Sequence, residues 1–392
     1  MRLNTSLIFI LLIVALIYSD RTHSQWYDSQ GTALIEEGNI KLARTRAIEN
    51  ALQTSFLVAG ASVSSVQQVV NGLLTQDEVS IRASGVVNSV EIIDEIITDE
   101  SIVVNIRADI FSHDSQCPAA SSKKSILLTK PNLLHREQAN IGRIFDIDDA
   151  TGDLFYHSLK DSSTYTYVKR ATQQKTDFSR LNNSYQIEKV KDLSMSLASH
   201  TDTQFIMFIE INDISFAHEP NNKWSFWELN EFDRNFNFSV YIYDGLNGEQ
   251  IFEQQYKGTA PWEFKKRESV DVNGLAFRQS KYGTEINKAI SKLINDIDEQ
   301  LMCDQSKGTI VALNNNIATI NIGKAHGLKI GDELTLLHSN NITADNGKTY
   351  AGFNISPFKI KIVQVSEQSA QGMSENGEVL GSIRINDIVV RK

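Results

Sequence analysis

The sequence has few cysteines and no excess of positive charge. Its 392 residues include only two cysteines, and 48 acidic residues outnumber 38 basic ones, so the formal net charge is −10. Nucleic-acid binding requires Lys and Arg clustered toward the phosphates, and we therefore expect no nucleic-acid partner. The acidic balance favours a soluble chain with protein partners. The length is sufficient for two or three domains with separate cores.

Recognisable catalytic motifs are also absent from the sequence. There is no nucleophile elbow, no glycine-rich phosphate loop and no paired-histidine zinc helix. The eight histidines are scattered, and none stands at metal-ligand spacing from another. We therefore predict that the chain is not an enzyme, that it has no catalytic residue and that it uses no cofactor.

One acidic stretch resembles a site for a hard cation. Asp146, Asp148 and Asp149 precede Gly152 and Asp153, and Ca²⁺ prefers clustered carboxylates. The spacing departs from that of a calcium loop, and the closing Glu is missing. We therefore predict no metal site but a solvated turn, in which Asp149 caps a helix over residues 151–159.

The only long apolar run lies at the start of the chain. Leu7–Ile17 is eleven residues long, whereas a membrane-spanning helix needs about 20 residues. Arg2 precedes the run and the small residues Thr22 and Ser24 follow it, which predicts a signal peptide over residues 1–24. An uncleaved anchor is the alternative. We expect no transmembrane segment in the mature chain and an oxidising compartment around it.

Residues 26–56 predict a strand followed by a helix with one apolar stripe. After Gly38 and Asn39, apolar residues recur at three- and four-residue steps from Ile40 to Phe56, as on one face of a helix. Asn39 is placed to cap this helix. Alternating residues from Ile102 to Ile110 predict a half-buried strand after a turn at residues 98–100. We predict a helix-on-sheet domain over residues 25–112 and a linker over residues 113–124.

Strands and helices alternate in the next part of the chain, which we predict to be an α/β domain over residues 125–302. Strands are expected at 125–129, 164–168 and 203–211, the last one central because it is apolar on both sides. A hairpin is expected around residues 244–248. Helices are expected at 188–199 and 284–302.

Short alternating strands fill residues 303–392 and no helix is evident, which predicts a small all-β barrel. The expected strands include 308–313, 317–322, 333–338, 358–365 and 388–390. The fold class is therefore α+β and multidomain.

An aromatic stretch stands out within the middle domain. Trp224, Phe226 and Trp227 lie close together between two predicted strands. One interpretation is an additional strand whose aromatic residues point into the core. The other is a protein-binding surface, since Trp residues often anchor interfaces.

Three patterns carry a resemblance to a known family. Trp26-Tyr27, Gly31-Thr32-Ala33 and the Ala-rich helix from Ala43 to Leu52 resemble the N-terminal domain of flagellar assembly protein T. The helix at 188–199, the strand at 203–211 and the hairpin that follows resemble the N-terminal domain of the Tol propeller protein, and the middle domain of the flagellar family has such a fold. The order of the three domains extends the resemblance over the mature chain.

The resemblance implies a structural protein of the periplasm, associated with the flagellar basal body. It would form a ring around the outer bushing through self-association and support the attachment of stator-anchoring ring proteins, and motility would require it. Its partners would be the other flagellar outer-ring and stator-anchoring ring proteins. The alternative class is a periplasmic envelope enzyme or a small-ligand-binding protein with a site between the first two domains.

The two cysteines predict a disulfide between Cys117 and Cys303. Cys117 precedes the first strand of the middle domain and Cys303 follows its last helix, and the ends of a domain are often close in space. The alternatives are two unpaired thiols or a bond to another copy of the chain.

Overall fold

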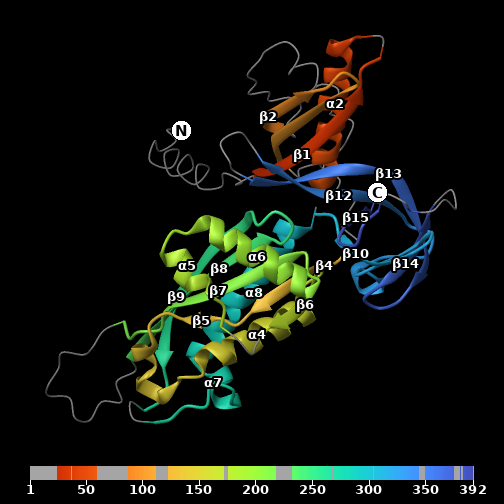
Figure 1. Cartoon of the computed structure of the whole chain (residues 1–392). Coiled ribbons are helices and arrows are strands. Elements are labelled where there is room, and N and C mark those ends of the chain that lie inside the picture. The colour runs from red at the N-terminus through yellow and green to blue at the C-terminus, as the bar shows by residue number, and fades with distance from the viewer. Residues whose placement is uncertain are drawn as a thin grey trace, which may run out of the picture.

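The structure is a computed structural model that describes residues 24–36, 38–59, 87–111, 122–171, 175–217, 232–265, 268–302, 304–343, 349–374, 380 and 383–391. Three units follow one another along the chain: an N-terminal unit up to residue 111, a middle unit over residues 122–302 and a barrel over residues 304–391. Figure 1 shows the N-terminal unit in red and orange, the middle unit in yellow and green, and the barrel in blue.

A strand, a helix and a hairpin make up the N-terminal unit. They are β1 (Ser24–Leu34), α2 (Ile40–Ala59), β2 (Val87–Ile97) and β3 (Ser101–Phe111). Gly38 adopts a φ of 71°, and the Asn39 Oδ1 accepts a hydrogen bond of 3.1 Å from the Leu42 amide. The predicted start of the helix and its Asn39 cap are therefore confirmed. Residues 60–86, which connect α2 with β2, lie outside the described residues.

The helix lies directly on β1 because Gly31 has no side chain. A Cβ at this position would collide with the Ala47 carbonyl oxygen of α2. Two residues away, the Ser29 hydroxyl donates to the Ala51 carbonyl oxygen at 2.7 Å. On β3 the predicted alternation is confirmed, since the residues at every second position from Ile102 to Ile110 are at most 1% exposed. The glycine of the sequence motif thus has a packing role.

The middle unit contains a sheet with the strand order β6-β4-β7-β8-β9. Its strands are β4 (Lys124–Thr129), β6 (Thr166–Ala171), β7 (Phe205–Asp213), β8 (Phe232–Asp244) and β9 (Gln250–Trp262), and the short β5 (Asn132–Leu133) pairs with β7. The strand β7 is central and buried on both faces, as predicted. The hairpin of β8 and β9 is confirmed, and β6 begins two residues later than predicted.

Helices cover both faces of this sheet. They are α4 (Ile147–Ser162), α5 (Phe178–Asn183), α6 (Ile187–Thr201), α7 (Leu275–Gln279) and α8 (Lys281–Leu301), with short 3-10 turns at η2 (Arg136–Ala139) and η3 (Ile141–Arg143). Helices α4, α7 and α8 share one apolar cluster with the sheet, and α5 and α6 share another. In Figure 1 these groups lie on opposite sides of β7.

The cap predicted for Asp149 is wrong. Helix α4 begins at Ile147, so Asp149 lies in its first turn, where its carboxylate pairs with the Lys130 ammonium at 2.6 Å. The residue at the cap position is Asp146, whose side chain makes no capping hydrogen bond. An acidic residue in the first turn still interacts favourably with the helix dipole.

The third unit is a closed barrel of six strands, which confirms the predicted small all-β barrel. They are β10 (Lys307–Asn314), β11 (Ile317–Ile320), β12 (Glu333–Thr343), β13 (Thr349–Val365), β14 (Ala370–Ser374) and β15 (Ile388–Arg391). Pairing of β12 with β13 closes the circle. The 3-10 turn η4 (Lys324–His326) lies between β11 and β12.

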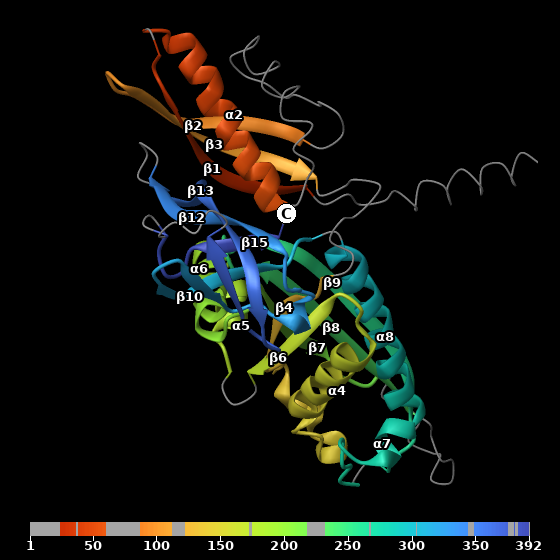
Figure 2. The ribbon, with the colours of Figure 1, turned by 90° about the vertical axis from the view of Figure 1, so that its right-hand side faces the viewer.

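One sheet joins the barrel to the N-terminal unit. The strand β13 begins nine residues earlier than predicted, and this extension pairs with β1 in parallel, with Asp28 opposite Gly352 and Ser29 opposite Phe353. Figure 2 shows β13 and β12 running from the barrel to the sheet of β1, β3 and β2. Side chains of Leu337, Phe353 and Ile388 enter the apolar core of the N-terminal unit.

Candidate functional site

The aromatic residues and the cysteines singled out in the sequence lie outside the described parts of the chain. Trp224, Phe226 and Trp227 belong to the segment 218–231, and Cys117 and Cys303 belong to 112–121 and to position 303. Neither the aromatic surface nor the disulfide is therefore tested, and both stay predictions. The described residues beside them show what holds each segment at its ends.

A buried arginine anchors both ends of the segment 218–231. Arg234 is 0% exposed. Its guanidinium donates to the backbone oxygens of Ile214 at 2.7 Å and Gln138 at 2.8 Å, and it lies 4.4 Å from the ring centroid of Trp262. Aromatic faces and carbonyl oxygens together replace the water around the cation. No sequence motif around Arg234 predicts this role, because the residue stands in an ordinary strand pattern.

The ends of the middle unit meet beside its own sheet. The Ser306 hydroxyl donates to the Lys123 carbonyl oxygen at 3.1 Å, and the Lys124 ammonium lies 3.3 Å from the Met302 carbonyl oxygen. The chain therefore enters and leaves this unit at one place. Cys303 is next to Met302, and Cys117 lies a few residues before Lys123.

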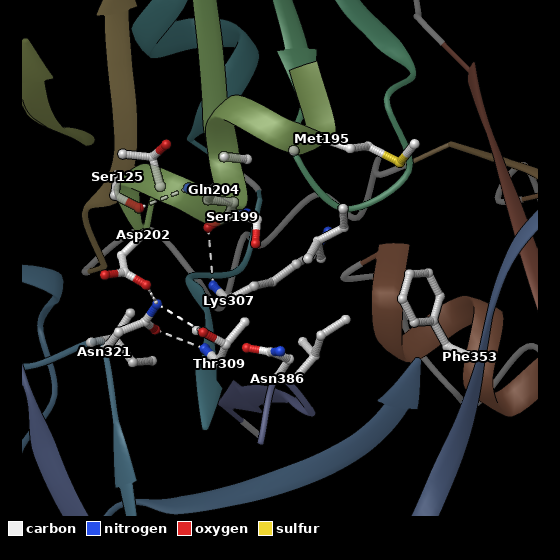
Figure 3. A pocket seen from close by; sticks show the side chains of 17 residues that line it. Ser125, Met195, Ser199, Asp202, Gln204, Lys307, Thr309, Asn321, Phe353 and Asn386 are labelled. Atoms are coloured by element: carbon white, nitrogen blue, oxygen red, sulfur yellow. Dashed lines mark hydrogen bonds between the residues drawn. The ribbon is translucent and has the colours of Figure 1, made fainter. Parts of the chain in front are cut away.

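A cavity of about 230 Å³ lies at this place, between the middle unit and the barrel (Figure 3). Its lining comes from α6, β4, β10, β13, β15 and the turns beside them, and it includes Ser125, Asp202, Gln204, Lys307, Thr309 and Asn321. The site foreseen by the alternative interpretation, between the first two units, is not where this cavity lies.

Gln204 holds the two strands that border the cavity. Its side-chain amide donates to the Gln305 carbonyl oxygen at 2.9 Å, and its side-chain oxygen accepts from the Lys307 amide at 3.0 Å. Its own backbone amide donates to the Ser125 hydroxyl at 2.9 Å. One buried side chain thus satisfies the backbone on both sides of the connection between the units.

Charged groups are buried next to Gln204. The Lys307 ammonium lies 3.3 Å from the Asp244 carboxylate, and both side chains are almost fully buried. Lys124 is 0% exposed, and burial lowers its pKa to about 8. Burial also raises the pKa of Asp304 to about 6, against the opposing effects of Lys307 and Lys124. Such groups are costly to bury unless they pair with one another, so they fix the geometry of the connection.

The N-terminal unit reaches the same charges through Tyr27 of β1. The Lys307 ammonium lies 6.0 Å from the ring centroid of Tyr27. Burial, with the negative charges of Asp304 and Asp244 adding to it, raises the pKa of the Tyr27 phenol well above its usual value. Three consecutive units of the chain therefore meet around one group of titratable residues.

Polar contacts continue along the seam between the middle unit and the barrel. The Asn321 amide donates to the Asp202 carboxylate at 3.0 Å, as Figure 3 shows. The Gln368 amide donates to the Tyr167 hydroxyl at 2.7 Å, and the Tyr167 ring contacts His326 edge-on. Burial, followed by the charge of Lys169, lowers the pKa of His326 to about 4. His326 is thus neutral near pH 7.

A second ionic contact links the N-terminal and middle units. Arg107 of β3 lies 3.6 Å from the Glu249 carboxylate, and Lys191 of α6 lies 2.7 Å from the same group. Leu246, from the turn between β8 and β9, packs against the apolar core of the N-terminal unit. Glu249 therefore connects a strand of one unit with a helix of the next.

The polar and charged groups of this junction hold the three units in position. Each carboxylate discussed has a cation or an amide beside it, and the amides of Gln204 and Asn321 are used to join strands. Among the described residues, no group of three or more His, Cys, Asp or Glu is placed to hold a metal ion. No helix within the described ranges is long and apolar enough to cross a membrane.

Comparison with known families decides where this architecture belongs. Models of flagellar assembly protein T match in chain order: the N-terminal domain over residues 25–112, the middle domain over 115–272 and the C-terminal domain over 315–391. The chain belongs to the flagellar assembly protein T family. The junction described above thus lies where the three domains of this family meet, and the resemblance to flagellar assembly protein T found in the sequence is confirmed.

Solved structures similar to this member of the flagellar assembly protein T family share part of the chain only. A hypothetical protein from Chlamydia trachomatis is 8% identical, with 46% of this chain and 99% of that chain covered and a TM-score of 0.34. A PelC dodecamer from Paraburkholderia phytofirmans is 8% identical, with 47% and 94% covered and a TM-score of 0.28. A lipoprotein from Neisseria meningitidis is 10% identical, with 45% and 99% covered and a TM-score of 0.24. A comparison with curated protein sequences found no significant match.

Proposed function

We propose that this protein is a non-enzymatic structural component of the flagellar basal body, located in the periplasm. It forms a ring around the outer bushing by self-association, supports the attachment of stator-anchoring ring proteins and is needed for motility. The observation that carries the proposal is the match of all three family domains, in order, along the chain. The proposal further divides the chain into domains at 25–112, 125–302 and 303–392, with a linker at 113–124. It gives the middle domain a fold like that of the N-terminal domain of the Tol propeller protein.

The interlocked junction supports a structural role. A ring component must hold its domains at fixed angles, and here buried charges, shared strands and side-chain amides tie the units together. Groups that pair with each other are not free to bind or convert a substrate. The alternative, an envelope enzyme or a ligand-binding protein, would use the cavity at this junction.

A strain that lacks the gene tests the proposal. We expect loss of motility with normal growth, and basal bodies that lack outer-ring density in electron micrographs. Expression of the wild-type chain from a plasmid should restore both. A metabolic defect in a strain that still swims would instead support the enzyme or ligand-binding alternative.

Export is tested on protein isolated from cells. The proposed signal peptide over residues 1–24 predicts an N-terminus at or near Gln25 by mass spectrometry. An intact Met1 would contradict cleavage and would support the uncleaved anchor.

The proposed disulfide between Cys117 and Cys303 is tested by thiol labelling of denatured, unreduced protein. The hydrogen bond between the Ser306 hydroxyl and the Lys123 carbonyl oxygen supports it, because these described residues follow the two cysteines closely in the sequence. We expect no labelled thiol on a monomeric band. Two labels per chain would contradict any bridge, and an unlabelled dimer would indicate a bond between copies.

The aromatic segment is tested by a double substitution, Trp224→Ala with Trp227→Ala. If these residues form a protein interface, the melting temperature should stay almost unchanged while ring assembly is lost. If they belong to the core, each truncation should cost about 3–5 kcal/mol of unfolding free energy. Trp262→Ala is a matched control, since Trp262 is 2% exposed and should behave as a core residue.

A further inference from the structure

The sheet that joins the N-terminal unit to the barrel has an outer edge at β2. Every other strand of this sheet has partners on both sides, because β12 closes onto β13. Within the described ranges, β2 pairs with β3 and with no other strand. In the strand order, this edge lies at the end of the sheet away from the barrel, so pairing with it would not require the N-terminal unit to separate from the barrel.

The hydrogen-bonding pattern identifies which groups of β2 point outward. The Thr98 amide donates to the Ser101 carbonyl oxygen at 2.9 Å, so these residues form a hydrogen-bonded pair at the end of the hairpin. Pairs alternate in an antiparallel ladder, so Ile97 and Glu95 direct their amides and carbonyl oxygens away from β3. The bulges of this ladder lie earlier, the last one between Ile92 and Asp94. From Asp94 to Ile97, β2 therefore pairs with β3 without a bulge.

The side chains of this edge are apolar and acidic. Ile92, Ile96 and Ile97 are 36%, 50% and 53% exposed. Between Val87 and Ser101 the sequence contains five acidic residues and no Lys or Arg. Proteins commonly protect a free edge with Lys side chains, and this edge has none.

Helix α2 extends the apolar surface and neutralises one carboxylate of the strand, that of Glu95. Arg44 pairs with Glu95 at 2.9 Å, so this side of the helix is turned toward β2. Ile40 lies one turn before Arg44 on the same side, and it is 50% exposed. Among the described residues, the pair of Arg44 and Glu95 is the one ion pair recorded between a cationic side chain and an acidic residue of β2.

We propose that the outer edge of β2 is a docking site for an extended segment of a partner protein in which apolar residues alternate with Lys or Arg. Backbone hydrogen bonds to Glu95 and Ile97 provide the affinity, and the isoleucines and carboxylates select the sequence. A second copy of this chain is disfavoured, because pairing β2 with β2 sets acidic residues opposite one another. The inference rests on the proposed assembly role, which requires protein partners.

A model peptide tests the site on the mature full-length chain. The probe is an acetylated, amidated peptide of about nine residues in which lysine and valine alternate. In fluorescence anisotropy it should bind about tenfold or more tightly than a matched glutamate–valine peptide. Hydrogen exchange at Glu95 and Ile97 should slow on binding. Ile97→Pro, which removes an outward amide, should weaken binding about tenfold or more, whereas Ile97→Thr should have a smaller effect.

Charge reversal separates a specific site from general attraction to an acidic protein. Glu91→Lys with Asp94→Lys should reverse the preference between the two peptides. The control is Asp192→Lys with Glu367→Lys, which changes the net charge equally at exposed positions of the middle unit and barrel. Equal losses in the two double variants would overturn the proposal. So would unchanged binding in Ile97→Pro with a wild-type melting temperature.

Hydrogen exchange measured without peptide shows whether a second copy of the chain, or another part of the same chain, covers the edge of β2. Fast exchange at Glu95 and Ile97 at all protein concentrations is expected. Protection that appears only at high concentration would mean that a second copy covers the edge. Protection at every concentration would mean that this chain covers its own edge, and either result would overturn the proposal. The assembly role would stand in each case, since the motility of the deletion strain tests it separately.

Discussion

The two neighbours of the barrel are attached to it in different ways. The N-terminal unit joins it through main-chain pairing of β1 with β13 and through shared apolar side chains such as Phe353. The middle unit joins it through side-chain hydrogen bonds and buried charges such as Lys307 and Asp244. Apolar contacts do not depend on protonation, whereas the second attachment contains titratable groups. The two attachments should therefore respond differently to pH and to substitution.

The largest expected effect is on the apolar attachment. Phe353 is 1% exposed and packs with residues of the N-terminal unit. Phe353→Ala should lower the free energy of unfolding by about 3–5 kcal/mol through lost burial and the resulting cavity, equally at pH 5 and pH 8. Urea unfolding at both pH values measures this. The control Ile355→Ala, at a position 38% exposed, should cost much less, and a similar loss in both variants would contradict the comparison.

A somewhat smaller effect is expected at the charged attachment. Asp244→Asn keeps the shape of the side chain but leaves the Lys307 ammonium buried without its carboxylate, which should cost about 3 kcal/mol. Adding Lys307→Met should recover part of the loss, and a double-mutant cycle measures the coupling. Additive losses in the double variant would show that the pair does not stabilise the junction.

The pH dependence sharpens the comparison. Burial raises the pKa of Asp304 to about 6 from the ordinary value of 3.8 for an aspartate, so between these values the folded chain binds more protons than the unfolded chain. The contribution of this group to stability is therefore largest at low pH and falls as the pH rises from about 4 to about 6. In the Asp304→Asn variant, the free energy of unfolding should lack this pH-dependent contribution. Unfolding free energies of wild type and variant, measured from pH 4 to pH 7, should differ in slope. Parallel profiles would contradict the assignment, and Asp192→Asn is an exposed control.

The smallest effect is expected at the rim of the same seam. Tyr167→Phe removes the hydroxyl that accepts from the Gln368 amide at 2.7 Å and keeps the ring against His326. Because Gln368 is exposed, the loss should be about 0.5 kcal/mol. Gln368→Ala should cost the same, and the two together should cost no more than either alone. A loss above about 2 kcal/mol would show that the rim, rather than the buried charges, holds the seam.

Local patterns predicted most of the elements, because each signal is contained in a short stretch. The apolar stripe of α8, the alternation of β3 and the apolar run of β7 all describe how one element meets its core. The start of helix α4 was predicted too late, because its first turn, Ile147–Ala150, is acidic and weakly periodic and therefore gives little helical signal. The short strand β14 was missed because small residues such as Gly372 carry little signal for a strand.

The junction could not be predicted, because its contacts join residues far apart in sequence. Nothing around Tyr27 indicates that Lys307 and Asp304 will lie beside it. The sequence pattern placed Gln204 only near the start of the predicted strand 203–211, whereas its role depends on where Gln305 and Lys307 lie in the fold. Resemblance to a family predicted the order of the domains, and the interactions between them required the structure.

The parallel pairing of β1 with β13 constrains the order in which the chain can reach its native state. Asp28 is made early in synthesis, and its partner Gly352 follows only when most of the chain has been translated. Until then β1 presents an open edge, and such edges promote aggregation. Contacts of long sequence separation also form slowly. The edge of β1 that pairs with β13 therefore stays without this partner during most of translation, and aggregation through it is most favoured in that interval.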